Sequence, residues 1–444
     1  MGNVLDEQST PPEEEQNHHD QDPFHIQLPP LFATRNFEFI RKVGKFRKIK
    51  DKLSRQDKLQ AFSLIKQGIE GDISAPEPSF YHFQNQLKYA AWSDVKGMSR
   101  GDAQKVAIKF IGELEKKHLD PKPHLFRVDT HFHVAPDFYV KAVESAGGHP
   151  GGYPKVPSSW DIESVKNMMH ELEIKHSILS VSAPGAALFS GEEGRRMARQ
   201  INEFCSQLSK DHDCFSFFVT LPSFFDVEGV LREIEYSLGL PGAVGVICFS
   251  SYSIKDETRY LGHSSFERIW ELLNQRKAVV FIHPNHGPSK QVSQYLPPPF
   301  LDYPQETTRA AADLVTSGMK TRFHSIKFIL SYAGGTVPYL ANRIVGTGII
   351  QELGTPNNYL EQLHAFRSFY YDVALSTSVP QLLSLLEIAD HERILFGSDL
   401  PYAPLPLSEF TTMNLDEYFQ QRGDYKLLDM INKLNAEKLF KRKF

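Results

Sequence analysis

The stretch Val128-Asp129-Thr130-His131-Phe132-His133 is a short apolar run that carries two histidines one residue apart. Side chains at positions i and i+2 of a β-strand point to the same face, so His131 and His133 can converge on one ion. Two later apolar runs end in His283 and Asp399. Taken singly, each of these residues is also consistent with a polar strand end or a turn. Together, three imidazoles and one carboxylate from three strand ends predict a site for a divalent metal ion.

The sequence around these residues predicts a scaffold that brings the strand ends together. Beyond residue 126, apolar runs alternate with helical stretches, and eight strands separated by helices are typical of a (β/α)8 TIM barrel. Such barrels carry their chemistry at the carboxyl ends of the strands, where all four predicted ligands fall. The connections 134–160 and 284–304 are expected to be loops, and the first can cover the barrel mouth. The predicted strands span 126–133, 177–182, 215–221, 243–249, 278–283, 326–331, 369–375 and 394–398, with helices between them such as 191–210, 226–238, 264–276, 305–320 and 378–389.

Residues 35–120 differ from the rest of the chain in charge. The 444-residue chain has a net charge of −5, but this segment alone holds 18 basic and 11 acidic residues. Residues 1–34 hold seven acidic residues and no lysine or arginine, which predicts a disordered acidic tail. A basic segment between acidic neighbours indicates an anionic partner. The Pro-containing stretch 119–125 is expected to link this segment, as a domain of residues 35–118, to a barrel domain of residues 126–444.

The number of cysteines and the hydropathy of the chain indicate the cellular compartment in which the protein works. The chain has three cysteines, Cys205, Cys214 and Cys248, which are few and odd in number, so a disulfide framework is not expected. We therefore expect a reducing compartment, the cytoplasm. No apolar run approaches the ~20 residues that a membrane span needs, and no signal peptide opens the chain. Neither a membrane span nor a nucleic-acid partner is predicted.

The basic segment has the periodicity of helices. Phe39, Val43 and Phe46 recur at helical spacing on one face. Ser99 followed by Asp102 resembles a capping box and predicts the start of the last helix. Four helices are predicted, at about 36–48, 55–69, 79–95 and 99–117.

An ordered series of residues in these helices resembles the acyl-CoA-binding protein family over about residues 35–118. That family is a four-helix module that binds long-chain acyl-CoA and holds its phosphates with lysines. The resemblance implies that Lys66, Lys88 and Arg47 contact phosphate and that Phe62 stacks on the adenine. The alternative is that these lysines form an ordinary solvated helix face. The matching residues are Lys66-Gln67, Gly71-Asp72, Lys88, Trp92, Lys96-Gly97, Ser99 and Asp102-Ala103.

The second half, from about 126 to 442, resembles the amidohydrolase-related metal enzymes, in particular their decarboxylase branch. That branch includes aminocarboxymuconate semialdehyde decarboxylase and the fungal 6-methylsalicylate decarboxylases. The resemblance implies a homodimeric, nonoxidative decarboxylase of a small aromatic carboxylic acid. It also implies that Asp399 is both a metal ligand and the group that handles the proton. The matching segments are Asp129-Thr130-His131-Phe132-His133, Ser180-Val181-Ser182-Ala183-Pro184-Gly185, Phe281-Ile282-His283-Pro284, Ala333-Gly334-Gly335-Thr336-Val337-Pro338-Tyr339-Leu340, Phe396-Gly397-Ser398-Asp399-Leu400-Pro401-Tyr402, Asn435-Ala436 and Leu439-Phe440.

One residue departs from the family pattern. The family usually has a histidine before Ala-Gly-Gly, at the end of the sixth strand, as a general base or proton shuttle. This chain has Tyr332 there. A phenol is a poorer base at neutral pH than an imidazole, but it donates a hydrogen bond well while protonated. His286, three residues beyond His283, is the alternative catalytic group, unless it is a histidine on a surface loop.

Three functions remain open from the sequence. The first is decarboxylation by a centre that holds Zn²⁺, the expected ion, or Mn²⁺, the alternative. The second is hydrolysis by a metal-activated water whose proton Asp399 takes; a CoA thioester as substrate would then connect the two halves. The third is a catalytically silent barrel in an acyl-CoA carrier or sensor. Retention of all four ligands favours an enzyme, and Tyr332 favours a lyase because decarboxylation needs no activated water.

Overall fold

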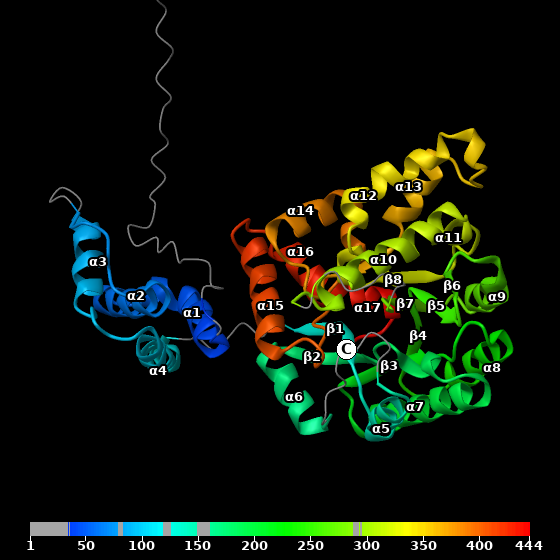
Figure 1. The fold of residues 1–444 in the computed structure, drawn as a ribbon, viewed down its shortest axis with the longest axis horizontal. Helices are drawn as coiled ribbons and strands as arrows, with labels where there is room; N and C mark the ends of the chain where they lie inside the picture. The colour runs from blue at the N-terminus through cyan, green and yellow to red at the C-terminus, as the bar shows by residue number, and fades with distance from the viewer. Residues whose placement is uncertain are drawn as a thin grey trace, which may run out of the picture. The chain divides into compact units, whose positions relative to one another are not determined.

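The computed structural model divides into two compact units, with the boundary between residues 120 and 121 (Figure 1). The predicted linker, 119–125, and the predicted tail, apart from Thr34, lie outside the described residues. No helix among the described residues is long and apolar enough to cross a membrane. The described residues are 34, 36–78, 83–118, 126–148, 160–286, 293 and 295–444.

The first unit contains the four predicted helices. Phe39, Val43 and Phe46, the predicted apolar face, are buried. The predicted start of the last helix is confirmed, because Ser99 Oγ accepts a hydrogen bond from the Asp102 amide at 3.1 Å. In the described residues the helices are α1 (Phe37–Ile49), α2 (Arg55–Glu70), α3 (Phe83–Ser93) and α4 (Arg100–His118), with the short turn η2 (Lys50–Lys52) after α1.

Several residues that carry the acyl-CoA-binding resemblance form a hydrogen-bond network. Gln67 on α2 donates to Asp72 Oδ1 and to the Met98 carbonyl, each at 2.7 Å. Asp72 Oδ1 also accepts from the Gly97 amide at 2.8 Å. The Trp92 indole on α3 donates to Gln67 Oε1 at 3.2 Å. These polar residues therefore connect α2 to α3 and to the turn before α4, which is a structural role.

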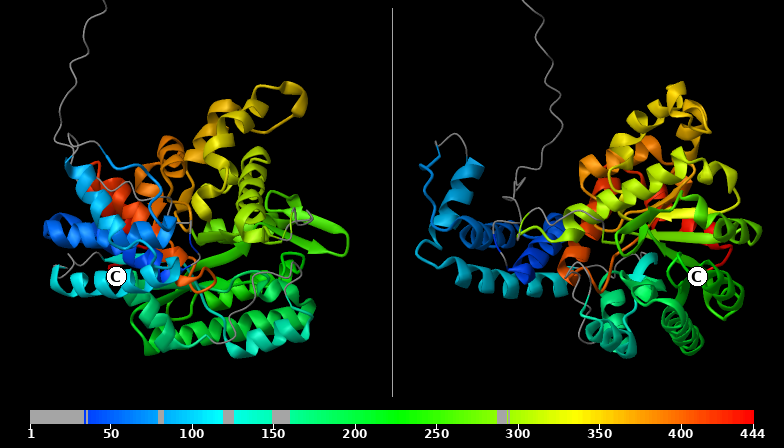
Figure 2. Two further views of the ribbon diagram at one scale, coloured as in Figure 1. Left: turned by 60° about the vertical axis from the view of Figure 1, so that its left-hand side comes forward. Right: turned by 45° about the vertical axis from the view of Figure 1, so that its right-hand side comes forward.

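The second unit is a barrel of eight parallel strands among the described residues, so the predicted TIM barrel is confirmed. A two-stranded antiparallel hairpin, β5 and β6, follows β4 and was not predicted; it projects from the barrel (Figure 2). The barrel strands are β1 (Arg127–His133), β2 (Ile174–Ser180), β3 (Phe215–Thr220), β4 (Ala243–Phe249), β7 (Val279–His283), β8 (Lys327–Leu330), β9 (Tyr370–Asp372) and β10 (Ile394–Leu395), and the hairpin strands are β5 (Ser251–Ile254) and β6 (Glu257–Tyr260).

Backbone hydrogen bonds close the barrel between its last and first strands. The Asp399 amide donates to the His131 carbonyl at 2.8 Å, and the His133 amide donates to the Leu400 carbonyl at 2.7 Å. The segment after β10 therefore runs beside β1 and carries Asp399 to the end of β1 where the two histidines lie.

Helices cover the outside of the strands (Figure 1). The expectation of a loop over 134–160 is wrong in part, because α5 forms there and buries Tyr139, Val140 and Val143 at helical spacing. The glycines and prolines later in that connection hid this short helix. The helices of the second unit are α5 (Asp137–Ser145), α6 (Ile162–Glu171), α7 (Gly191–Asp211), α8 (Val227–Ser237), α9 (Glu267–Gln275), α10 (Pro298–Thr316), α11 (Met319–Arg322), α12 (Val337–Ile344), α13 (Tyr359–Arg367), α14 (Val379–Ile388), α15 (Leu405–Gln420), α16 (Tyr425–Asp429) and α17 (Asn435–Phe440).

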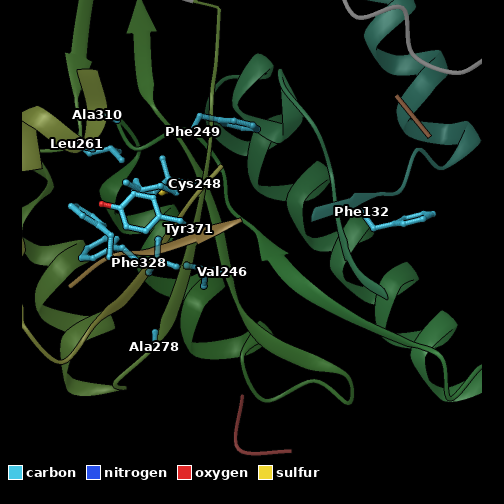
Figure 3. Close-up of a cluster of buried hydrophobic side chains, with 14 of the residues drawn as sticks. Phe132, Val246, Cys248, Phe249, Leu261, Ala278, Ala310, Phe328 and Tyr371 are labelled. Carbon is cyan, nitrogen blue, oxygen red and sulfur yellow. The ribbon is translucent and has the colours of Figure 1, made fainter. Parts of the chain in front are cut away.

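Two apolar layers hold the barrel. The larger lies between strands and helices, and Figure 3 shows part of it, with Phe328 and Tyr371 among the buried side chains. The smaller fills the barrel interior, where Val128 and Phe281 pack in one cluster with Leu439 of α17. Because interior side chains fill the barrel, it is a packed core and the strand ends are held in fixed positions.

A buried ion pair fixes the start of β1. Arg127 donates to both carboxylate oxygens of Asp416 on α15, at 2.7 and 2.8 Å, and to the Leu172 carbonyl at 2.8 Å. Removing one partner of such a pair typically costs about 3–5 kcal/mol. Since β1 carries two of the predicted ligands, this pair helps to hold them in place.

Candidate metal centre and active site

The structure brings the four predicted ligands together. His131 and His133 come from β1, His283 ends β7, and Asp399 follows β10. All four are buried, and one candidate ligand atom from each lies within 4.8 Å of the others. We refer to these four residues as the ligand cluster.

Hydrogen bonds on the far side of each imidazole orient the three histidines. His131 Nδ1 lies 3.0 Å from Asp372 Oδ2, and His283 Nδ1 lies 2.8 Å from the Pro284 carbonyl. His133 Nδ1 lies 3.2 Å from the Ser180 carbonyl. Each Nδ1 has a partner that can accept its proton, so the Nε2 of each imidazole can act as a metal ligand once it carries no proton.

Asp399 joins the cluster through one oxygen and leaves the other to Tyr332. Its Oδ1 lies 3.0 Å from His133 Nε2 and 3.6 Å from His131 Nε2. Its Oδ2 accepts a hydrogen bond from the Tyr332 hydroxyl at 3.0 Å. Asp399 also has a backbone φ of +63°, in the left-handed region that costs a non-glycine residue energy and is frequent at functional sites.

The cluster fits a divalent metal ion. His131 Nε2 is buried and has no hydrogen-bond partner among the described residues. Burial by itself raises the pKa of Asp399, but the hydrogen bond from His133 and the charge of His131 outweigh it and lower that pKa. An ionised carboxylate among three imidazoles is a donor set that Zn²⁺ and Mn²⁺ both accept.

Tyr332 is suited to donate a hydrogen bond and poorly suited to act as a base. It is buried two residues beyond the end of β8 and has a backbone φ of +55°. Burial first, and then the charge of Asp399, raise the pKa of Tyr332 well above its usual value. The hydroxyl therefore stays protonated and holds Asp399 Oδ2.

Asp372 is a candidate site residue that the sequence did not single out. It lies at the end of β9, and β10 separates β9 from β1. Gly397 makes its contact with His131 possible, since a Cβ added there would lie 2.8 Å from the His131 Cβ and 3.3 Å from the Asp372 Cβ. The sequence signal was weak, because the predicted strand of residues 369–375 places Asp372 in its middle, whereas β9 ends at Asp372.

Tyr402 is a second residue whose role was missed. Its ring centroid lies 5.2 Å from that of His133, and its hydroxyl is buried without a hydrogen-bond partner among the described residues. A buried hydroxyl costs free energy unless a partner satisfies it, so this phenol can donate to a bound ligand.

Family comparisons agree with both halves of the chain. A family model described as amidohydrolase matches residues 128–442, and another described as acyl-CoA-binding protein matches residues 35–111. The chain belongs to the amidohydrolase family. Its first 120 residues contain the acyl-CoA-binding match.

Relatives of the amidohydrolase barrel include proteins named as decarboxylases. Decarboxylase macB of Penicillium terrestre is 39% identical over 318 residues, which cover 67% of this chain and 90% of that protein. The 6-methylsalicylic acid decarboxylase of Penicillium expansum is 38% identical over 281 residues, which cover 63% of this chain and 86% of that protein. A crystal structure of an amidohydrolase II aligns with a TM-score of 0.62 at 26% identity and covers 71% of this chain and 100% of that one.

His286 is not part of the ligand cluster. It lines a cavity of about 460 Å³, together with Pro184, Ser223 and Asn285, which follow β2, β3 and β7. The cavity is therefore at the same end of the amidohydrolase barrel as the metal centre. A direct catalytic role for His286 stays a prediction.

The candidate acyl-CoA residues lie on the first three helices. The Lys88 Nζ is 5.9 Å from the ring centroid of Phe62, and the Lys66 Nζ is 5.1 Å from the ring centroid of Trp92. Lys66 and Lys88 are therefore on facing parts of α2 and α3, whereas Arg47 lies on α1. Phe62 is only 8% exposed, so its ring has little free face for stacking on an adenine.

Replacing both β1 ligands tests the metal site. The variant with His131→Ala and His133→Ala should bind no stoichiometric Zn²⁺ or Mn²⁺, because two of four donors are lost. Asp372→Asn should weaken metal affinity by about 10–100-fold, since Asp372 orients His131 and is not itself a member of the ligand cluster. Metal content by plasma mass spectrometry and metal titration of the apo protein measure both effects. Stoichiometric metal in the double variant would contradict the assignment.

Proposed function

We propose that the chain is a metal-dependent, nonoxidative carboxy-lyase that removes CO₂ from a small aromatic carboxylic acid, and that its helical module binds fatty acyl-CoA. The observation that carries this proposal is the buried ligand cluster at the carboxyl ends of the barrel strands. The relatives named as decarboxylases, at 38–39% identity over most of their length, support the same chemistry.

Decarboxylation exchanges a carbon–carboxylate bond for a carbon–hydrogen bond. The bonding electron pair stays on the ring carbon as CO₂ leaves, and that carbon takes one proton supplied by the solvent. The ligand cluster would hold the divalent ion, which supplies Lewis-acid stabilisation of negative charge on substrate oxygens.

Asp399 is the group suited to carry the proton to the ring carbon. Its Oδ2 accepts the hydrogen bond of the Tyr332 hydroxyl, so the carboxylate keeps one orientation. The Tyr402 hydroxyl, buried beside His133, offers a donor to a carboxylate or phenolate oxygen of the substrate. Both phenols act as donors, which suits the stabilisation of developing negative charge.

A hydrolase would need Asp399, or a histidine at the usual family position, to take a proton from the attacking water. Tyr332 occupies the position where the family usually has a histidine, and its hydroxyl is already engaged as a donor to Asp399. This arrangement favours the lyase over hydrolysis of a CoA ester. A silent barrel has no need of oriented ligands, yet a hydrogen-bond partner fixes each histidine of the cluster.

We also propose a cytosolic homodimer. The three cysteines are free, which fits a reducing compartment. The segment from α12 to α13 exposes apolar side chains that a subunit interface could bury, among them Tyr339 at 84%, Ile349 at 68% and Leu360 at 71% exposure.

A substrate screen tests the lyase proposal. Zn²⁺-loaded and Mn²⁺-loaded protein should release CO₂ from at least one hydroxybenzoate, with 6-methylsalicylate as the first compound to test. Muconates and acyl-CoAs complete the panel, and free thiol is followed in the same reactions. Release of thiol from an acyl-CoA without CO₂ from any acid would support the hydrolase instead.

Tyr332→Phe tests the role of the phenol. The variant keeps the ring and loses the donor to Asp399 Oδ2, so kcat should fall by about 10–100-fold with unchanged metal content. Tyr332→His restores the usual family residue and should retain or raise activity. Wild-type turnover in both variants would remove Tyr332 from the mechanism.

Lysine substitutions test the acyl-CoA module. Lys66→Ala and Lys88→Ala should each weaken acyl-CoA binding by about 1.5–3 kcal/mol, because hydrogen bonds to charged phosphate are lost. Lys109→Ala, an exposed lysine on α4, is the matched control and should bind like wild type. Calorimetry at two salt concentrations measures this, since added salt should weaken the phosphate contacts. Unchanged acyl-CoA affinity in both variants would mean that Lys66 and Lys88 are ordinary solvated surface residues that do not contact the ligand.

A further inference from the structure

A cavity of about 730 Å³ lies at the end of the barrel opposite the metal centre. Its lining includes Lys327 and Tyr370, the first residues of β8 and β9, and Arg393, which directly precedes β10. In a parallel barrel the amino ends of the strands share one face, and the carboxyl ends with the ligand cluster share the other. A ligand in this cavity is therefore not the substrate of the metal centre.

The lining of this cavity is strongly cationic. It contains Lys277, Lys320, Lys327 and Arg393 against one acidic side chain, Glu361. Among the described residues, none of the three lysines forms an ion pair. Like charges held together with few counter-charges repel one another, so the fold keeps these cations together at a cost in stability.

Lys320 is the least expected of the cationic residues that line this cavity. It is 5% exposed, and its Nζ donates to Ser368 Oγ at 2.7 Å. The rings of Phe328 and Phe369 lie 5.8 and 5.2 Å from that Nζ. Burial first, and then the charge of Arg393, lower the pKa of Lys320 to about 8. A lysine this buried is ordinarily paired with a carboxylate, so the missing partner indicates an external anion.

The remaining members of the cavity support the same conclusion. Burial and neighbouring cations, Lys441 first among them, lower the pKa of Lys327. Arg393 reaches the cavity with its guanidinium 4.9 Å from the Tyr370 ring and donates to the Ser368 carbonyl at 3.1 Å. Arg393 Nε also lies 3.4 Å from Asp390 Oδ2, so Arg393 is the member whose charge is partly balanced.

We propose that this cavity binds a small polyanion that carries two or more phosphate groups. Three lysines act as point charges toward phosphate oxygens, and lysine is a common phosphate ligand in this sense. The cavity volume of about 730 Å³ is in the range of sites for small molecules and exceeds what a single phosphate ion fills. The site is independent of the proposed decarboxylase activity, and its position at the amino ends of the strands assigns it to regulation or stability.

Calorimetry of the full-length protein with sodium tripolyphosphate tests the proposal. We expect saturable binding of one tripolyphosphate per chain that weakens with added salt. Lys320→Met keeps an apolar side chain in the buried position, and Lys277→Gln changes an exposed residue. Each should weaken binding by about tenfold or more. Lys210→Gln removes the same charge from an exposed position on α7 and should bind like wild type.

A comparison of ATP with tripolyphosphate shows which part of a ligand the cavity recognises. ATP that binds more tightly than tripolyphosphate, with the same dependence on Lys320 and Lys277, would identify a nucleotide as the ligand; equal affinity would identify the phosphate chain. Thermal unfolding of each variant shows that the fold is kept. The proposal is wrong if tripolyphosphate does not bind at millimolar concentration, or if both cavity variants bind it like wild type. It is also wrong if only Lys66→Ala, in the helical module, abolishes the binding.

Discussion

The hydrogen bond from the Asp399 amide to the His131 carbonyl, at 2.8 Å, joins the end of the barrel to its beginning. Together with the hydrogen bond from the His133 amide to the Leu400 carbonyl, at 2.7 Å, it holds the carboxylate that follows β10 beside the two histidines of β1. The same closure sets β10 between β1 and β9, and Gly397 leaves room there for Asp372 to reach His131. The ligand cluster therefore depends on barrel closure and on the register of β1, β9 and β10, and β7 contributes the remaining ligand, His283.

Much of this arrangement could be predicted because it follows local rules. The i, i+2 spacing of His131 and His133 determines that they share a face, and apolar runs ending in His283 and Asp399 identify further strand ends. The barrel itself could be predicted from the alternation of strands and helices. The buried stripe of α1 and the start of α4 likewise follow from helical spacing and capping.

What could not be predicted depends on which strands become neighbours. Asp372 looks like any carboxylate in a loop or strand until β9 is known to lie near β1. Tyr402 becomes a candidate site residue only once its ring is known to pack against His133. The helix α5 was missed because its three buried residues precede a long stretch rich in glycine and proline. Stacking of Phe62 on an adenine stays a prediction, and the sequence alone could not show that its side chain is 8% exposed in the module.

The two ends of the barrel differ in chemistry. One end gathers imidazoles and a carboxylate that suit a cation, and the other gathers lysines that suit an anion. The central claim concerns the first end: CO₂ leaves and a proton takes its place on the ring carbon. Turnover in D₂O, followed by mass spectrometry and NMR of the product, tests this most directly on the first acid that releases CO₂. We predict one deuterium at the carbon that carried the carboxylate and no oxygen taken up from ¹⁸O-labelled water. A product that contains ¹⁸O and lacks the deuterium would contradict the account.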